Sequence, residues 1–392
     1  MPSLNKIFYG RQSISDNDIK NVKKSLRCKT LTQGPLVAKL ENNFKKYLDS
    51  KYALVCSSGT AALHLSLLSI GIKKNDIIIM PSINFIAIYN LSISLGAKVI
   101  LVDVDPLTGQ MMPEKVLSLI NSKNKVKIKA IVTMNLGGYP ENIKKFFDIK
   151  KKFGAYLIED ACHALGSRFQ YNNKLKKIGS CKYSDISTFS LHAVKIITSG
   201  EGGVISTNNR FLAKRIETLR SHGLKKDKKY YWKYKHEDFG YNYRLSEINC
   251  SLAISQLSRI ENFIKKRKKI AQYYVKNLTP LKNFITIPNY SNFNLSSFHL
   301  FVIHLNLNNL KGSKDSFFKF LNKKKIYPQF HYMPIYRIVK NFKHNLNKFE
   351  NTEKYYKTAV SIPIYYDLTF KDQDHVIRSI KKYINIYKVK NV

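Results

Sequence analysis

A lysine next to a glycine-rich loop is the first feature of this sequence that suggests chemistry. An apolar segment ends at Ser190, a turn presents Lys195, and the sequence GEGG follows at 200–203. A lysine amine held on such a turn can act as a nucleophile and form a Schiff base with an aldehyde cofactor. Because the chain contains 67 lysines and arginines, Lys195 has a competing interpretation as one more solvated surface lysine.

Two acidic residues, Glu159 and Asp160, end another apolar segment. In open α/β sheets, ligands bind outside the carboxyl ends of the strands, where these side chains would lie. An aspartate there could keep the ring nitrogen of pyridoxal phosphate (PLP) protonated, so that the ring acts as an electron sink. The competing interpretation of Asp160 is a helix N-cap, and the sequence leaves both open.

A third segment has the composition of an anion site. Apolar residues 52–56 are followed by SSGT at 57–60 and then by a helical pattern, with Thr60 at the expected N-cap. Backbone N–H groups at a helix N-terminus, beside small residues that allow close approach, suit a phosphate. Phe85, after the next apolar segment, could stack on a flat ring or belong to the core.

The elements that must position these residues follow from the hydrophobic pattern. Short β-branched segments alternate with helical patterns at 61–68, 113–120 and 143–153, and Pro113 fits a first helical turn. This alternation predicts an α/β domain built on a largely parallel, seven-stranded sheet. The expected strands are residues 52–56, 76–80, 98–104, 128–134, 155–159, 186–190 and 203–206.

The pattern changes after residue 244. Residues 246–278 predict one long helix, followed by a strand at 298–305, a helix at 314–323 and a closing helix at 372–387. We therefore expect a large domain at 1–260 and a smaller C-terminal α+β domain at 261–392.

The net charge of the 392-residue chain is +41, from 67 basic and 26 acidic residues. A charge of this size is typical of nucleic-acid or membrane binding when it gathers in a stripe. Here the lysines are spread along nearly the whole sequence. This distribution favours a diffuse basic surface on a protein that handles anionic small molecules, with neither a nucleic-acid nor a membrane partner.

The cysteines, the N-terminus and the most apolar stretch indicate in which compartment the protein works. The five cysteines form no C-x-x-C pair, so neither a disulfide framework nor a metal site is predicted. The N-terminus lacks the apolar core of a secretory signal, and the apolar stretch 77–104 is interrupted by Pro81, Asn84 and Lys98. We expect a cytoplasmic protein.

These segments, in this order, resemble the DegT/StrS family of PLP-dependent nucleotide-sugar aminotransferases. The resemblance extends beyond them to YGRQS at 9–13, LTQGP at 31–35, RSHG at 220–223, GYNYRLSE at 240–247, QFHY at 329–332 and SIP at 361–363. It implies the fold-type I, aspartate aminotransferase-like architecture. Within the family, the sequence most resembles the branch that transfers an amino group from L-glutamate to C4 of a UDP-linked 4-keto-6-deoxy-N-acetylhexosamine in pseudaminic acid biosynthesis.

The resemblance implies roles for individual residues. Lys195 and Asp160 would be catalytic, the first as the lysine that binds PLP and moves protons, the second as partner of the ring nitrogen. Asn242 would reach the cofactor phosphate from the neighbouring subunit, so that the active site requires a homodimer. The implied cofactor-binding residues are Gly59, Thr60, Phe85, Asp160, His163, Ser190, Lys195 and Asn242. The implied substrate-binding residues are Tyr9, Lys29, Thr30, Leu31, Thr32, Gly59, Ser190, Asn242, Gln329, Phe330, His331 and Tyr332.

Departures and alternatives stay open at this point. Ile88 stands where the family often has threonine, and His163 where many relatives have glutamine. Ordinary packing competes with substrate binding for Tyr9, His331 and Tyr332. The same chemistry could act on a GDP- or dTDP-linked sugar, or at C3. Deoxygenating relatives carry histidine in place of the lysine, and a regulatory or nucleic-acid-binding member would not need the catalytic set.

Overall fold

The structure is a computed structural model that describes residues 6–122, 127–227, 229–230, 232–291, 293–340, 342 and 346–389. A seven-stranded sheet forms its centre, in the order β2-β10-β9-β6-β5-β3-β4. Only β10 runs antiparallel to its neighbours. The strands are β2 (Tyr52–Cys56), β3 (Ile77–Pro81), β4 (Lys98–Val102), β5 (Ile128–Met134), β6 (Tyr156–Asp160), β9 (Ile186–Ser190) and β10 (Gly203–Thr207). The predicted α/β class and mostly parallel sheet are confirmed.

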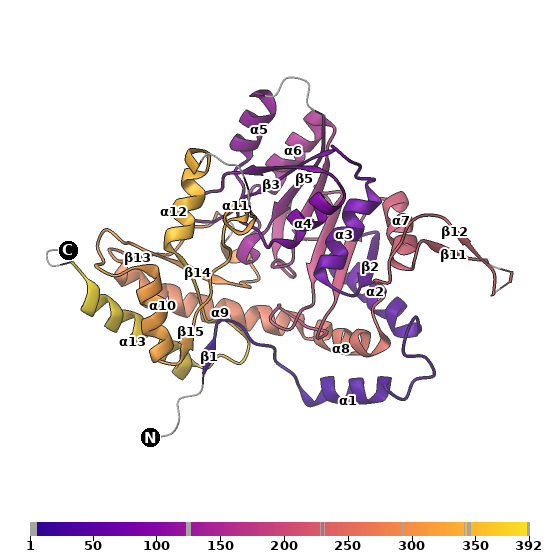
Figure 1. Cartoon of the computed structure of the whole chain (residues 1–392). Coiled ribbons are helices and arrows are strands. Elements are labelled where there is room, and N and C mark those ends of the chain that lie inside the picture. Colours follow the sequence, from indigo (N-terminus) through magenta and orange to yellow (C-terminus); the bar gives the residue numbers. More distant parts are fainter. Residues whose placement is uncertain are drawn as a thin grey trace.

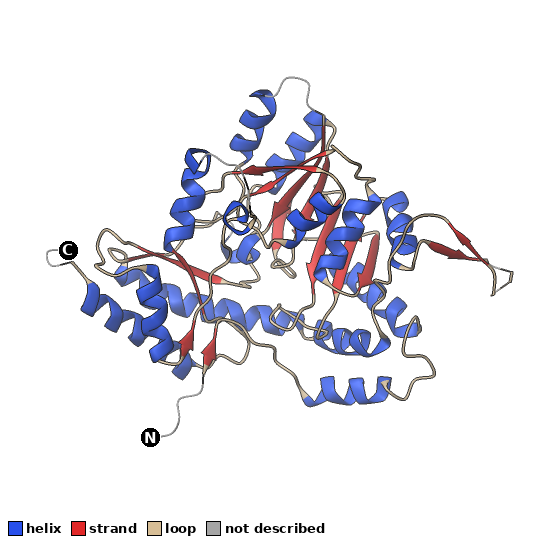
Figure 2. Ribbon diagram, in the orientation of Figure 1, coloured by secondary structure: helices blue, strands red, loops and turns tan. Residues whose placement is uncertain are grey.

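Helices cover both faces of this sheet (Figures 1 and 2). Successive strand residues point to opposite faces, so Leu54 and Cys56 pack on one side, and Ala53 and Val55 on the other. Because both faces are buried, the strands are almost continuously apolar. One face carries α3 (Gly59–Ser69), α4 (Ala87–Ser94) and α7 (Arg210–Arg220). The other carries α2 (Pro35–Leu48), α5 (Pro113–Ser122), α6 (Ile143–Phe153) and α8 (Glu247–Ser258).

The C-terminal part is built on a three-stranded antiparallel sheet in the order β13-β14-β16. Its own apolar core includes Ile303, Phe317 and Ile380. The strand β1 (Ile7–Phe8) pairs in parallel with β15 (Ile326–Tyr327), so the first described strand lies beside this part. The remaining elements here are β13 (Ile285–Thr286), β14 (Phe301–Leu305), β16 (Ala359–Ile362), α9 (Ile260–Leu278), α10 (Lys314–Lys323), α11 (Ile335–Ile338), α12 (Glu350–Thr358) and α13 (Phe370–Tyr387). The division at residue 260 stays a prediction.

Two local predictions are wrong. The single helix expected over 246–278 breaks at Arg259, whose guanidinium bonds Oδ2 of the buried Asp18 at 2.5 Å. This contact ties the junction of α8 and α9 to α1 (Asp16–Ser25). The N-cap of α3 is Ser58 rather than Thr60, because the Ser58 hydroxyl accepts the Ala61 N–H at 3.0 Å.

Two hairpins were not predicted. The first joins β7 (Arg168–Tyr171) to β8 (Lys174–Lys177), and the second joins β11 (Leu224–Lys226) to β12 (Tyr234–His236). Figure 1 shows the second hairpin extending away from the body of the chain. Among the described residues, no helix is both long and apolar enough to cross a membrane.

Candidate active site

A cavity of about 500 Å³ opens at the carboxyl ends of the central strands. Its walls come from the end of β6, the segment after β9, the start of α3 and residues 329–332 of the C-terminal part. It therefore lies where an open α/β sheet binds ligands. The predicted site residues that line it are Tyr9, Gly59, Thr60, Phe85, Asp160, His163, Ser190, Lys195, Gln329, Phe330, His331 and Tyr332.

Lys195 and Asp160 face this one cavity from neighbouring strand ends. Burial lowers the pKa of the Lys195 amine, while Cys162 and Asp160 act in the opposite direction. Burial raises the pKa of Asp160, and hydrogen bonding with Cys162 and the charge of Lys195 oppose that rise. This placement favours a chemical role for Lys195 over a solvated surface lysine.

The carboxylate of Asp160 is held by the turn that follows β6. The Cys162 N–H donates to Asp160 Oδ1 at 3.2 Å. Residues 161–166 form turns and no helix, so the interpretation of Asp160 as a helix N-cap is wrong. Sequence reasoning missed Cys162 as a member of the site, although its position two residues after Asp160 was a usable signal.

The start of α3 forms a cradle for an anion. The N-cap Ser58, Gly59 and Thr60 line the cavity together with Ser190. A Cβ added to Gly59 would lie 2.9 Å from Cβ of Ser190, so only glycine lets the helix terminus approach this strand end. Free N–H groups and hydroxyls at a helix N-terminus bind phosphate oxygens.

Phe85 lies at the cavity with 54% of its surface exposed, so it is not a core residue. An open ring face in a cavity that also holds an acid and an amine suits a flat aromatic ligand. Ile88, by contrast, is fully buried among apolar residues around α3 and α4. The departure from threonine at position 88 therefore serves packing.

The wall from the C-terminal part is a cluster of rings. Tyr332 Oη lies 2.9 Å from His163 Nε2, and His331 Nδ1 lies 2.9 Å from Ser361 Oγ. The rings of Tyr9 and His331 are 5.0 Å apart. Tyr9, His331 and Tyr332 thus pack together and also line the cavity, so the two interpretations of these residues are compatible.

Five predicted site residues lie outside the cavity formed by this chain. Residues 30–32 are fixed near α8, because the Leu31 carbonyl accepts the Glu247 N–H at 2.9 Å. Asn242 forms a bridge with Ser221, close to the β11–β12 hairpin. The roles of Lys29, Thr30, Leu31, Thr32 and Asn242 stay predictions.

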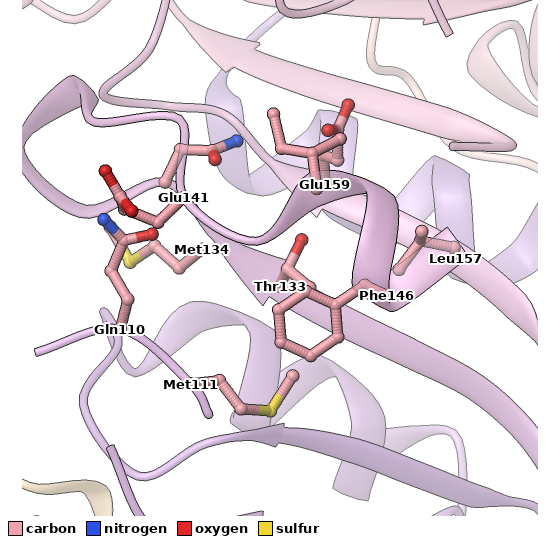
Figure 3. A pocket seen from close by; sticks show the side chains of 10 residues that line it. Gln110, Met111, Thr133, Met134, Glu141, Phe146, Leu157 and Glu159 are labelled. Carbon is pink, nitrogen blue, oxygen red and sulfur yellow. The ribbon is translucent and has the colours of Figure 1, made fainter. Parts of the chain in front are cut away.

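The second acid at the end of β6 faces away from the cavity. Ser184 and Ser187 donate to Glu159 Oε2 at 2.8 Å and 2.5 Å. Glu159 also borders a separate small space of about 10 Å³ with Thr133 and Glu141 (Figure 3). That volume holds about one water molecule. Only Asp160 of the two predicted acids therefore enters the cavity.

A family model for DegT/DnrJ/EryC1/StrS aminotransferases matches residues 12–381. The chain belongs to this aminotransferase family. An uncharacterized protein of Methanocaldococcus jannaschii is 33% identical over 96% of this chain and 97% of its own length. A UDP-4-amino-4,6-dideoxy-N-acetyl-beta-L-altrosamine transaminase of Campylobacter jejuni subsp. jejuni serotype O:23/36 (strain 81-176) is 35% identical over 94% of this chain and 95% of its own length.

Solved structures agree with this assignment. Helicobacter pylori PseC, an aminotransferase involved in the biosynthesis of pseudoaminic acid, superposes with a TM-score of 0.88 at 28% identity, over 97% of this chain and 100% of that one. A putative sugar aminotransferase of Streptococcus pneumoniae, solved in PLP and pyridoxamine phosphate forms, shares the fold with a TM-score of 0.87 at 23% identity, over 97% of this chain and 99% of that one. The predicted fold-type I architecture, aminotransferase activity and PLP cofactor are confirmed for this family member.

Proposed function

We propose that this aminotransferase moves an amino group from L-glutamate to C4 of a UDP-linked 4-keto-6-deoxy-N-acetylhexosamine, as a homodimer with shared active sites. The observation that carries the proposal is the near full-length similarity to the Campylobacter jejuni transaminase, 35% identical over 94% of the chain. It is supported by a cavity of about 500 Å³ that holds the lysine, the acid and the anion cradle together.

The residues of the cavity fit PLP. The glycine cradle at α3 with Ser58, Thr60 and Ser190 would hold its phosphate. Phe85 would cover one face of the ring, and Asp160 would pair with the ring nitrogen. When bound, PLP supplies an electron sink and carries the amino group between donor and acceptor.

Lys195 moves the proton in this arrangement. A proton transfer catalyst works best when its pKa lies near the working pH, and burial lowers the pKa of the Lys195 amine. Its free amine would then be able to accept a proton from one carbon and return it to another. Asp160 has the opposite task, because it must stay ionised to keep the ring nitrogen protonated. The Cys162 N–H and the charge of Lys195 favour that ionised form.

A substrate panel tests the proposal. The purified protein is incubated with PLP, glutamate and UDP-, GDP- or dTDP-linked keto sugars, and products are read by mass spectrometry and NMR. We expect an amine at C4 of the UDP-linked sugar and equimolar 2-oxoglutarate. Product formation only from GDP- or dTDP-linked sugars, or an amine at C3, would replace the proposed substrate with one of those alternatives.

A further inference from the structure

A short series of hydrogen bonds lies behind the cavity wall at Tyr332. The backbone N–H of Gly137 donates to Nδ1 of His163 at 3.3 Å. On the other side of the same ring, Nε2 lies 2.9 Å from the Tyr332 hydroxyl oxygen. His163 is only 1% exposed, and Tyr332 lines the cavity. The series therefore runs from a buried backbone group to the surface that a ligand meets.

The direction of these hydrogen bonds is fixed at Gly137. A backbone N–H can only donate, so Nδ1 of His163 must be the unprotonated acceptor. A neutral imidazole carries its single proton on the other nitrogen, so Nε2–H donates to the Tyr332 oxygen. Burial and the nearby charge of Lys195 lower the pKa of His163 well below its ordinary value. The His163 ring is therefore neutral. Burial also lowers the pKa values of the neighbouring His299 and His331.

The direction of the hydrogen bond from His163 decides whether the Tyr332 hydroxyl donates or accepts in the cavity. Its oxygen already accepts from His163, so its own proton is the group left to donate. His163 is the only hydrogen-bond partner of the Tyr332 hydroxyl within the described part of the chain. Burial and the charge of Asp160 raise the pKa of Tyr332, so the phenol keeps its proton.

We propose that Gly137 and His163 hold Tyr332 as a fixed hydrogen-bond donor to an acceptor oxygen in the cavity. The inference rests on the proposed function for the identity of that oxygen, which is either the oxygen of the 3-hydroxyl group of PLP or the keto oxygen of the sugar. A ketone only accepts hydrogen bonds, whereas the protonated amine that replaces it only donates. If the oxygen belongs to the sugar, the fixed donor favours the keto substrate over the amino product.

The tautomer of His163 tests the first step without cofactor, substrate or turnover. The cofactor-free protein is labelled with ¹⁵N-histidine, and its side-chain nitrogens are observed by NMR. His163→Gln assigns the signal by removing it. We expect an unprotonated Nδ1 and a protonated Nε2. A protonated Nδ1, in a neutral or a cationic ring, would overturn the proposal whatever the enzyme's substrate is.

Binding to the cofactor-free protein tests the second step. Tyr332→Phe removes only the hydroxyl, and Tyr273→Phe, which loses a hydrogen bond to Asp374 far from the cavity, is the matched control. Titrations with PLP and with the UDP-linked keto sugar are followed separately. We expect Tyr332→Phe to weaken one ligand about tenfold. A loss for PLP places the acceptor on the cofactor, and a loss for the sugar places it on the substrate. Unchanged affinity for both overturns the proposal.

Discussion

The two walls of the cavity differ in how many of their predicted site residues come from one chain. The wall at the strand ends brings Lys195, Asp160 and the α3 cradle together within a single subunit. The opposite wall has residues 329–332, but Asn242 and the loop at 29–32 lie elsewhere on the same chain. One chain thus brings together the residues proposed to hold the cofactor, whereas Asn242 and residues 29–32 would have to come from the second subunit of the proposed homodimer.

Replacing Lys195, in the wall at the strand ends, should cause the largest loss of activity. Lys195→Ala removes the amine that we propose binds PLP and moves the proton, so we expect turnover to fall by at least about a thousandfold. The measurement is the initial rate of 2-oxoglutarate formation, with thermal unfolding as a check on folding. Lys319→Ala, on the exposed face of α10, is the control and should leave the rate unchanged. Substantial activity in Lys195→Ala would contradict the assignment.

The two adjacent acids of β6 allow a second comparison, because Asp160 lines the cavity and Glu159 does not. In the proposed arrangement, Asp160→Asn would no longer keep the ring nitrogen of PLP protonated, so kcat should fall by about a hundredfold or more. Glu159→Gln weakens buried hydrogen bonds from Ser184 and Ser187 instead. It should change the free energy of unfolding by about 1 kcal/mol and leave kcat nearly unchanged. Steady-state kinetics and denaturant unfolding are measured for both variants. An equal fall of kcat in the two variants would contradict the different roles of the two acids.

Subunit mixing tests whether the incomplete wall is shared. Asn242→Ala should reduce activity on its own, and Lys195→Ala should abolish it. If Asn242 serves the partner's site, each mixed dimer has one intact site, so an equal mixture that re-equilibrates should regain about a quarter of wild-type activity. If Asn242 serves its own chain, mixing restores nothing. Light scattering of each protein reports the oligomeric state.

The smallest expected effect concerns Lys314, which supports the C-terminal wall from behind. Its Nζ lies 3.7 Å from the ring centroid of Phe330, and burial lowers its pKa to about 8. Between about pH 8 and the unfolded value near 10.4, the unfolded chain binds more protons. The native protein should therefore gain stability over Lys314→Met as pH rises through this window. Because the amine is partly exposed, we expect about 1 kcal/mol. Denaturant unfolding at pH 7.5 and 10 measures this difference, and a constant difference would contradict it.

Local patterns predicted the parts of the fold whose causes are local. The seven strands were predictable because both sheet faces are buried. Asp160 and Lys195 were predictable because the first ends such a strand and the second lies in the turn after one. The break at Arg259 was not visible, since it depends on Asp18, which lies 241 positions earlier. The charged β11–β12 hairpin has no hydrophobic alternation to reveal it. The sequence could not show that Ser58 rather than Thr60 caps α3, because both residues carry a hydroxyl suited to an N-cap and only the backbone geometry distinguishes them.

The most direct test of the account is to locate the covalent bond between cofactor and protein. Wild-type protein loaded with PLP is reduced with borohydride, which converts the carbon–nitrogen double bond to a stable secondary amine, and digested for peptide mass spectrometry. We expect one phosphopyridoxyl group, on Lys195. A group on another lysine, or none at all, would contradict the central claim that the cavity between Lys195 and Asp160 holds PLP.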